Sequence, residues 1–236
     1  MRIYPAILSD NLEKIQLQLD LVKKYDWLDV VQIDIIDGLF ADNMTVAVED
    51  LTGLDFGELQ IDLHLMVLEP LSVVNDFLSF KDELPVRAVI GQLERMSHPQ
   101  EFINELKKEE LKAGLGLDLF TAVEEIQPYL NQDLDMVQLM GVEAGWQGRQ
   151  FNKLLYKNVH QLQSLLEKLL EKAAAEKSFD PRDIDILVDG GVKFPQLEEL
   201  QQLNVDGVGI GSLIFAAEER GEKVEEIMSQ LKKFSK

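Results

Sequence analysis

Short apolar runs alternate along the chain with longer amphipathic segments. The short runs favour β-branched residues and end at polar or turn-forming residues, which is typical of strands. The longer segments carry apolar residues at helical spacing, and several begin after capping residues such as Asn11. The pattern predicts strands over residues 3–8, 30–35, 59–67, 87–93, 112–117, 136–142, 184–188 and 208–210. It predicts helices over residues 12–25, 71–80, 100–109, 121–131, 153–177, 195–203 and 224–234.

The alternation of strands and helices predicts an α/β fold with a parallel sheet. Eight strands, seven of them followed by a predicted helix, in a chain of 236 residues predict closure of that sheet into a TIM (β/α)8 barrel. We therefore expect residues 1–236 to form a single barrel domain. The rival architecture is an open, doubly wound sheet, which commonly carries a G-x-G-x-x-G turn after its first strand. No such turn follows residues 3–8, which favours the barrel.

The charge of the chain narrows its expected partners. The sequence holds 43 acidic and 23 basic residues, a formal net charge of −20. Nucleic acids and anionic membranes attract positive surfaces, so we expect neither as a partner. An anionic ligand needs local backbone donors or a metal ion to overcome this field. The absence of cysteine excludes thiol chemistry, and no apolar run suits a signal peptide or membrane span, so we expect a cytoplasmic protein.

Polar residues stand near the ends of three predicted strands. Residues 30–38 read VVQIDIIDG, and strand alternation places Gln32 and Asp34 on one face. A buried carboxylate is unfavourable alone, so Asp34 should have a cation, a metal or strong donors beside it. His64 and Asp189 occupy similar positions on the third and seventh strands. Strand ends meet at one mouth of a TIM barrel, so these side chains predict a divalent metal site.

Glycines follow the last two predicted strands. Gly190 and Gly191 follow the seventh, while Gly209, Gly211 and Ser212 accompany the eighth, at the expected start of a short helical segment. Glycine lets backbone N–H groups approach a ligand, and a helix N-terminus attracts anions. The loops after strands seven and eight are the usual phosphate site of this barrel class. We therefore predict a phosphate site here; the alternative is glycines that serve only tight turns.

Six motifs, in order along the chain, resemble those of the ribulose-phosphate 3-epimerases. They are PAILS at 5–9, QIDIIDGLF at 32–40, DLHLMV at 62–67, MGVEAGWQGRQF at 140–151, VDGGV at 188–192 and GSLIF at 211–215. The resemblance covers nearly the whole chain. It implies a TIM barrel of the ribulose-phosphate-binding type.

The resemblance also implies a metal site and a substrate site. It implies one divalent ion (zinc, manganese, iron, cobalt or magnesium) bound by Asp34, His64 and Asp189, with Gln32 in the fourth ligand position. Asp34 and Asp189 double as acid and base on opposite faces of the sugar. The implied substrate- and phosphate-binding residues are His64, Gly145, Trp146, Gln147, Gly148, Gly190, Gly191, Gly211 and Ser212. The expected partners are a sugar phosphate and further copies of the chain in a homo-oligomer.

Departures from the family pattern leave three functions open. The family has His where this chain has Gln32, and Ser where it has Ala6. The leading hypothesis is a metal-dependent epimerase of the D-ribulose 5-phosphate/D-xylulose 5-phosphate type, with two-carboxylate proton transfer through an enediolate. A lyase or aldolase on a related sugar phosphate is the second, although no lysine stands at a strand end for a Schiff base. Gln32 and Ala6 favour the third, a non-catalytic phosphosugar-binding protein.

Overall fold

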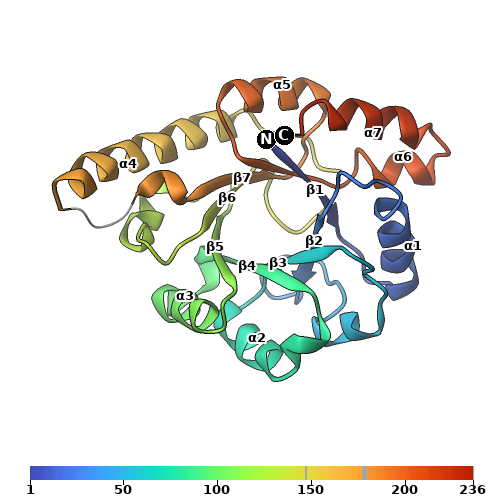
Figure 1. The fold of residues 1–236 in the computed structure, drawn as a ribbon, viewed down its shortest axis with the longest axis horizontal. Coiled ribbons are helices and arrows are strands. Elements are labelled where there is room, and N and C mark those ends of the chain that lie inside the picture. Colours follow the sequence, from blue (N-terminus) through green and yellow to red (C-terminus); the bar gives the residue numbers. More distant parts are fainter. Residues whose placement is uncertain (147, 177–179, 236) are drawn as a thin grey trace.

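Eight parallel strands form a closed barrel surrounded by helices (Figure 1). The computed structural model describes residues 1–146, 148–176 and 180–235. The strands are β1 (Arg2–Ile7), β2 (Val30–Ile36), β3 (Gln60–Met66), β4 (Val86–Gln92), β5 (Lys112–Leu117), β6 (Met136–Met140), β7 (Asp185–Asp189) and β8 (Gly207–Ile210). Each strand pairs with the next, and β8 pairs with β1. The predicted TIM barrel is confirmed, and the open sheet is excluded.

The helices lie outside the strands. The α-helices are α1 (Leu12–Val22), α2 (Pro70–Phe77), α3 (Pro99–Lys108), α4 (Leu154–Glu176), α5 (Phe194–Gln202), α6 (Phe215–Glu219) and α7 (Val224–Lys232). Short 3-10 helices cover Glu49–Gly53, Leu78–Glu83, Leu93–Arg95, Val123–Tyr129 and Pro181–Asp183. Within the described residues, no helix is long and apolar enough to cross a membrane.

Two local predictions differ from the structure. The α-helix expected over residues 121–131 is a 3-10 helix, Val123–Tyr129. Pro128 lies within it, and proline lacks the N–H group that an α-helix interior needs. Residues 212–214, expected to open a helix, form a turn instead, and α6 begins only at Phe215. The Gly211–Ser212 segment therefore precedes the helix rather than forming its first turn.

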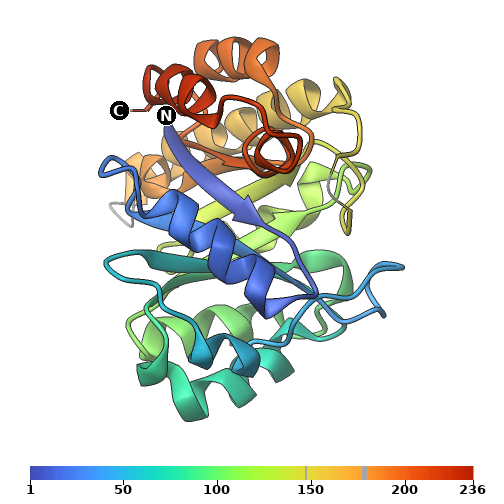
Figure 2. The same ribbon diagram turned by 90° about the vertical axis from the view of Figure 1, so that its right-hand side faces the viewer.

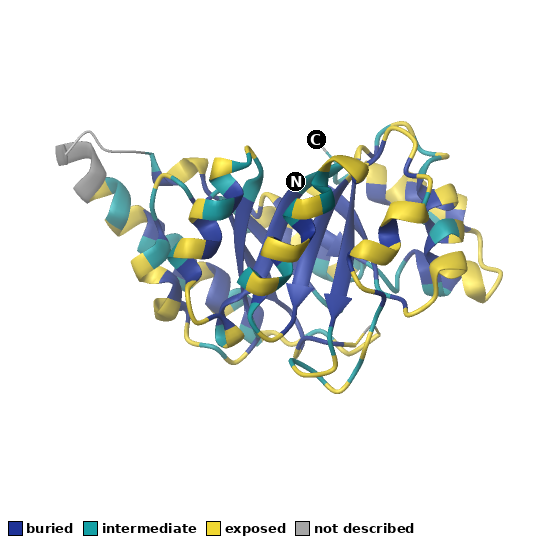
Figure 3. Ribbon diagram, turned by 90° about the horizontal axis from the view of Figure 1, so that it is seen from below, coloured by how far each residue is buried: buried dark blue, intermediate teal, exposed yellow. Residues whose placement is uncertain are grey.

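The main apolar core lies between the barrel wall and the helices. Val31 and Ile33 of β2 belong to the same buried cluster as Ile15 and Leu19 of α1. Figure 3 shows the strands buried along their length, whereas the helices expose their outer faces. A parallel sheet covered in this way is apolar on its outer face, which explains the apolar runs in the sequence. The inner face is then free to carry the polar residues of a site.

The polar ends of the strands gather at one mouth of the barrel. Strand register pairs Asp34 with His64 and Met140 with Asp189. The chain termini lie close together at the opposite mouth (Figures 1 and 2). In Figure 2, the loops after β2 and β6 project from the mouth that holds the polar residues.

Candidate active site

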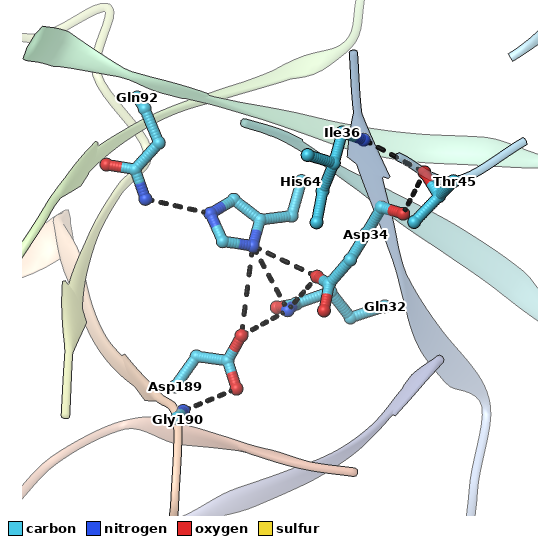
Figure 4. Close-up of polar contacts among 8 residues, drawn as sticks. All are labelled: Gln32, Asp34, Ile36, Thr45, His64, Gln92, Asp189 and Gly190. Carbon is cyan, nitrogen blue, oxygen red and sulfur yellow. Dashed lines mark hydrogen bonds and ion pairs between the residues drawn. The ribbon is translucent and has the colours of Figure 1, made fainter. Parts of the chain in front are cut away.

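Four buried polar side chains converge at the carboxyl ends of three strands (Figure 4). Gln32 and Asp34 come from β2, His64 from β3 and Asp189 from β7. The amide nitrogen of Gln32 lies between the two carboxylates, 2.9 Å from Asp34 Oδ1 and 2.7 Å from Asp189 Oδ2. The same nitrogen lies 3.5 Å from His64 Nδ1. The predicted convergence of these residues is therefore present.

The imidazole of His64 lies beside both carboxylates. His64 Nδ1 lies 3.0 Å from Asp34 Oδ1 and 3.8 Å from Asp189 Oδ2. Burial disfavours the charged imidazole, but the carboxylates outweigh burial and raise the pKa of His64. Burial and the charge of Asp34 raise the pKa of Asp189 to about 6. Asp34 thus has the strong donors that its burial requires.

Backbone contacts hold the two carboxylate residues in place. Thr45, in the loop after β2, donates its hydroxyl to the carbonyl of Asp34 at 3.1 Å. Asp189 Oδ1 accepts a hydrogen bond of 2.6 Å from the amide of Gly190. A Cβ atom at position 209 would lie 2.5 Å from Asp189 Oδ1. Gly209 therefore leaves room for the Asp189 carboxylate, a role that the sequence did not reveal.

Gln92 of β4 orients the ring of His64, and sequence analysis missed it. With its amide oxygen towards the ring, Gln92 accepts from His64 Nε2 at 3.0 Å. Its amide nitrogen then donates to Glu94 Oε2 at 3.0 Å and to the carbonyl of Gly116 at 3.1 Å. This arrangement keeps a proton on Nε2 and leaves Nδ1 facing the carboxylates. The signal available in the sequence was a polar residue ending an apolar strand.

A divalent metal ion fits three of the converging side chains. Asp34, His64 and Asp189 each offer one ligand atom, and these atoms lie within 4.8 Å of one another. Two carboxylates and an imidazole form a donor set that several divalent metals accept. Gln32 currently turns its nitrogen towards this group, and an amide nitrogen is not a metal ligand. A half-turn of the amide exchanges that nitrogen for the carbonyl oxygen, which is a ligand.

A cavity opens over these residues and reaches the loops predicted to bind substrate. Asp34 and Asp189 line it beside Met66 and Met140. The predicted residues that also line it are Gly145, Trp146, Gly148, Gly190, Gly191, Gly211 and Ser212. Gln147 lies outside the described residues. His64 does not line the cavity, because its ring is fully buried beside Asp34.

Tight packing explains some of the glycines without a ligand. Gly190 and Gly191 have φ values of +99° and +71°, which disfavour any side chain. A Cβ at Gly191 would lie 2.8 Å from the backbone nitrogen of Phe151, in the loop after β6. The amide of Gly190 is already bonded to Asp189. Its N–H group therefore serves the carboxylate rather than standing free for an anion.

The family comparison agrees with the motifs in the sequence. A sequence profile of the ribulose-phosphate 3 epimerase family matches residues 2–215. The chain belongs to this family. The expectation drawn from the six motifs is therefore confirmed, and with it the assignment to a family of isomerases.

Relatives in this family match the chain over almost its whole length. The ribulose-phosphate 3-epimerase of Helicobacter pylori strain J99 is 28% identical over 228 residues, covering 95% of each chain. The ribulose-phosphate 3-epimerase of Bacillus subtilis is 28% identical over 234 residues, covering 96% of this chain and 98% of the relative. The comparison therefore covers nearly the full length of these relatives rather than one part of them.

Solved structures of other enzymes share the fold. A mutant tryptophan synthase α-subunit of Pyrococcus furiosus has a TM-score of 0.62 at 14% identity, covering 98% of this chain and 94% of that one. A phosphoribosyl anthranilate isomerase of Thermus thermophilus has a TM-score of 0.55 at 13% identity, covering 91% of this chain and 88% of that one. At such identities the likeness concerns the barrel alone.

Proposed function

We propose that the chain is a metal-dependent 3-epimerase that interconverts D-ribulose 5-phosphate and D-xylulose 5-phosphate. The observation that carries the proposal is the pair of buried carboxylates, Asp34 and Asp189, which line one cavity from opposite sides of a shared donor. Membership of the family supports the sugar-phosphate substrate. The glycine-rich wall of the same cavity offers a place for the phosphate.

Epimerisation next to a ketone needs two proton-transfer groups. One group removes the proton from the carbon to give an enediolate, and the other returns a proton to the opposite face. Asp34 and Asp189 stand on β2 and β7, so a substrate held between them presents a different face to each. A carboxylate beside the reacting carbon can take up a proton from one face, and the carboxyl group opposite can return one. In the reverse reaction the two residues exchange roles.

The residues around the carboxylates could bind a metal ion or orient its ligands. Asp34, His64 and Asp189 would hold the ion, and Gln32 would complete the set through its amide oxygen. When bound, a divalent ion supplies Lewis acidity that stabilises negative charge on a ketone oxygen. Gln92 fixes the ring of His64, and the Gln32 amide separates the two carboxylates when its nitrogen faces them.

The remaining residues orient the substrate. Met66 and Met140 give the cavity an apolar lining beside the carboxylates. Gly191, Gly211 and Ser212 would bind the phosphate, which anchors the sugar far from the reacting carbon. Gly145, Trp146 and Gly148, which follow β6, line the same cavity. Assembly of the chain into a homo-oligomer and its location in the cytoplasm remain predictions from the sequence.

Substitution of each carboxylate tests the proposed reaction. Turnover of D-ribulose 5-phosphate is measured for the wild type, Asp34→Asn and Asp189→Asn, with the exposed Asp82→Asn as the matched control. We expect each site variant to lose at least about 10²-fold in kcat, the range for one acid–base group. The control should keep full activity. A fully active Asp34→Asn or Asp189→Asn variant would rule out the two-carboxylate reaction.

The second candidate function is sugar-phosphate binding without catalysis. The Gln32 amide favours it, because its nitrogen stands between the carboxylates where the ion of an active site would be. A wild-type protein that binds D-ribulose 5-phosphate but neither binds metal nor turns the sugar over would establish this candidate in place of the first.

A further inference from the structure

Lys193 makes a contact that prepares Ser212 to bind an anion. Lys193 follows the Gly190–Gly191 turn, and its Nζ donates a hydrogen bond of 2.7 Å to Ser212 Oγ. Ser212 lines the cavity, whereas Lys193 is not among the described residues that line it. An ammonium group only donates, so Ser212 Oγ must accept, and the hydroxyl hydrogen remains available for another acceptor. The contact therefore leaves Ser212 as a hydrogen-bond donor beside the cavity.

Lys193 also lacks the ion pair that other lysines of this acidic chain form. Lys14, Lys81 and Lys107 each pair with a carboxylate. In the part of the chain that the structure describes, no carboxylate lies within 4.0 Å of Lys193 Nζ. Its side chain is half-buried, and burial together with the charge of Arg220 lowers the pKa of Lys193. An ammonium group in such surroundings gains from a nearby anion.

The cavity needs a source of positive charge if it binds a phosphate ester. The chain has a formal net charge of −20, and Asp34 and Asp189 line the same cavity. The amide of Gly190 is occupied by Asp189. Fewer backbone N–H groups are therefore free to bind the phosphate than the sequence predicted. The carboxylates that line the cavity also repel it.

We propose that Lys193 strengthens the binding of a phosphate group in this cavity, by donating to Ser212 and by supplying the positive charge that the backbone donors lack. This proposal rests on the proposed function and deepens it. Lys193 is a positioning residue for the phosphate, because it acts through Ser212 and through its charge. It takes no part in proton transfer at the sugar carbon.

Neutral and charged replacements of Lys193 test the proposal. Affinity for inorganic phosphate is measured by calorimetry, and KM and kcat with D-ribulose 5-phosphate, for wild type, Lys193→Met and Lys193→Arg. We expect Lys193→Met to weaken phosphate binding and to raise KM by about 10- to 100-fold, the range for a charge-assisted hydrogen bond. Its kcat should change little, and Lys193→Arg should restore most of the affinity. Lys168→Met, which removes an exposed lysine of α4, should match the wild type.

A second variant tests the role of Ser212. Ser212→Ala removes the hydroxyl that accepts from Lys193. If the two side chains act as a unit, Lys193→Met should weaken phosphate binding less in the Ser212→Ala background than in the wild type. Strictly additive effects would overturn the proposed action through the serine.

The possible outcomes separate this inference from the proposed function. Equal phosphate affinity in folded wild type and Lys193→Met overturns the role of Lys193 and leaves the epimerase proposal standing. A loss of kcat with unchanged KM also overturns it, because a charge at the phosphate acts on binding. A wild type that binds neither inorganic phosphate nor D-ribulose 5-phosphate overturns both.

Discussion

Asn43 and Gly145 join two loops across the mouth of the barrel. The side-chain nitrogen of Asn43, after β2, donates a hydrogen bond of 2.7 Å to the carbonyl of Gly145, after β6. Gly145 has a φ of +108°, and a Cβ atom there would collide with Ala41. Both the backbone conformation and the close approach therefore require glycine at this position. The contact places Gly145 and Trp146 where they line the cavity.

We expect Gly145→Ala to separate the two loops and weaken substrate binding. The substitution adds backbone strain of about 1 kcal/mol or more as well as the collision with Ala41. KM for D-ribulose 5-phosphate should rise roughly tenfold, equivalent to about 1.4 kcal/mol of lost binding. Gly53→Ala is the matched control, because nothing lies within 4 Å of its added Cβ. Kinetics of both variants check this, and an unchanged KM in Gly145→Ala would show that the contact does not shape the site.

A buried ion pair below the site predicts a stability effect. Arg87 bonds Asp62 Oδ1 through Nε at 2.9 Å and stacks 5.6 Å from the ring centre of Tyr4. Arg87→Leu leaves the Asp62 carboxylate buried alone, so we expect a loss of about 3–5 kcal/mol in the free energy of unfolding at neutral pH. Urea unfolding measures it. Arg87→Leu combined with Asp62→Leu is the control, and it should recover much of the loss.

The loss in Arg87→Leu should also depend on pH. Burial raises the pKa of Asp62, and Arg87 opposes that rise. Without Arg87 the folded protein binds a proton at Asp62 more tightly than the unfolded chain does. The destabilisation is then smallest in acid and grows as the pH rises through the folded-state pKa of Asp62. Equal losses at pH 5 and pH 8 would contradict a buried, unpaired Asp62.

The fold could be predicted because each barrel strand is covered on its outer side. Residues such as Val31 and Ile33 must be apolar there, so the strands stand out as runs in the sequence. The convergence of Asp34, His64 and Asp189 followed from the same fold, since a parallel barrel brings all strand ends to one mouth. Most of the correct predictions therefore followed from the number of strands and from the polar residues at their ends.

The remaining features depend on contacts between distant residues. Sequence periodicity does not say which atom of the Gln32 amide faces the carboxylates, because both atoms sit on the same side chain. It also does not reveal that Gln92 meets His64, or that Lys193 meets Ser212 across two loops. Periodicity also does not place the start of α6, which follows a turn at residues 212–214.

Gln92 should control metal affinity through His64. Gln92→Leu removes the acceptor for His64 Nε2, so the ring loses its fixed orientation. We expect divalent metal affinity to fall by about 10- to 100-fold, as for other partners of metal-binding histidines. Gln138→Leu is a matched control, because Gln138 is equally buried and its Nε2 lacks a hydrogen-bond partner within the described structure. Titration with Mn²⁺ measures the affinity of both variants and of the wild type. Equal affinities in Gln92→Leu and the wild type would show that Gln92 does not influence metal binding.

Gln32→His should change which metal the protein prefers. In the wild type, Gln32 can offer only an amide oxygen, which suits Mn²⁺ or Mg²⁺ better than Zn²⁺. An imidazole at this position adds a nitrogen ligand to Asp34, His64 and Asp189, so zinc affinity should rise and turnover of D-ribulose 5-phosphate with it. Metal content and turnover are measured for wild type, Gln32→His and Asp189→Asn side by side. Asp189→Asn should lose both, because it removes a ligand and an acid–base group. If the wild type binds no metal at any concentration and Gln32→His does not recover binding, the epimerase proposal falls and sugar-phosphate binding takes its place.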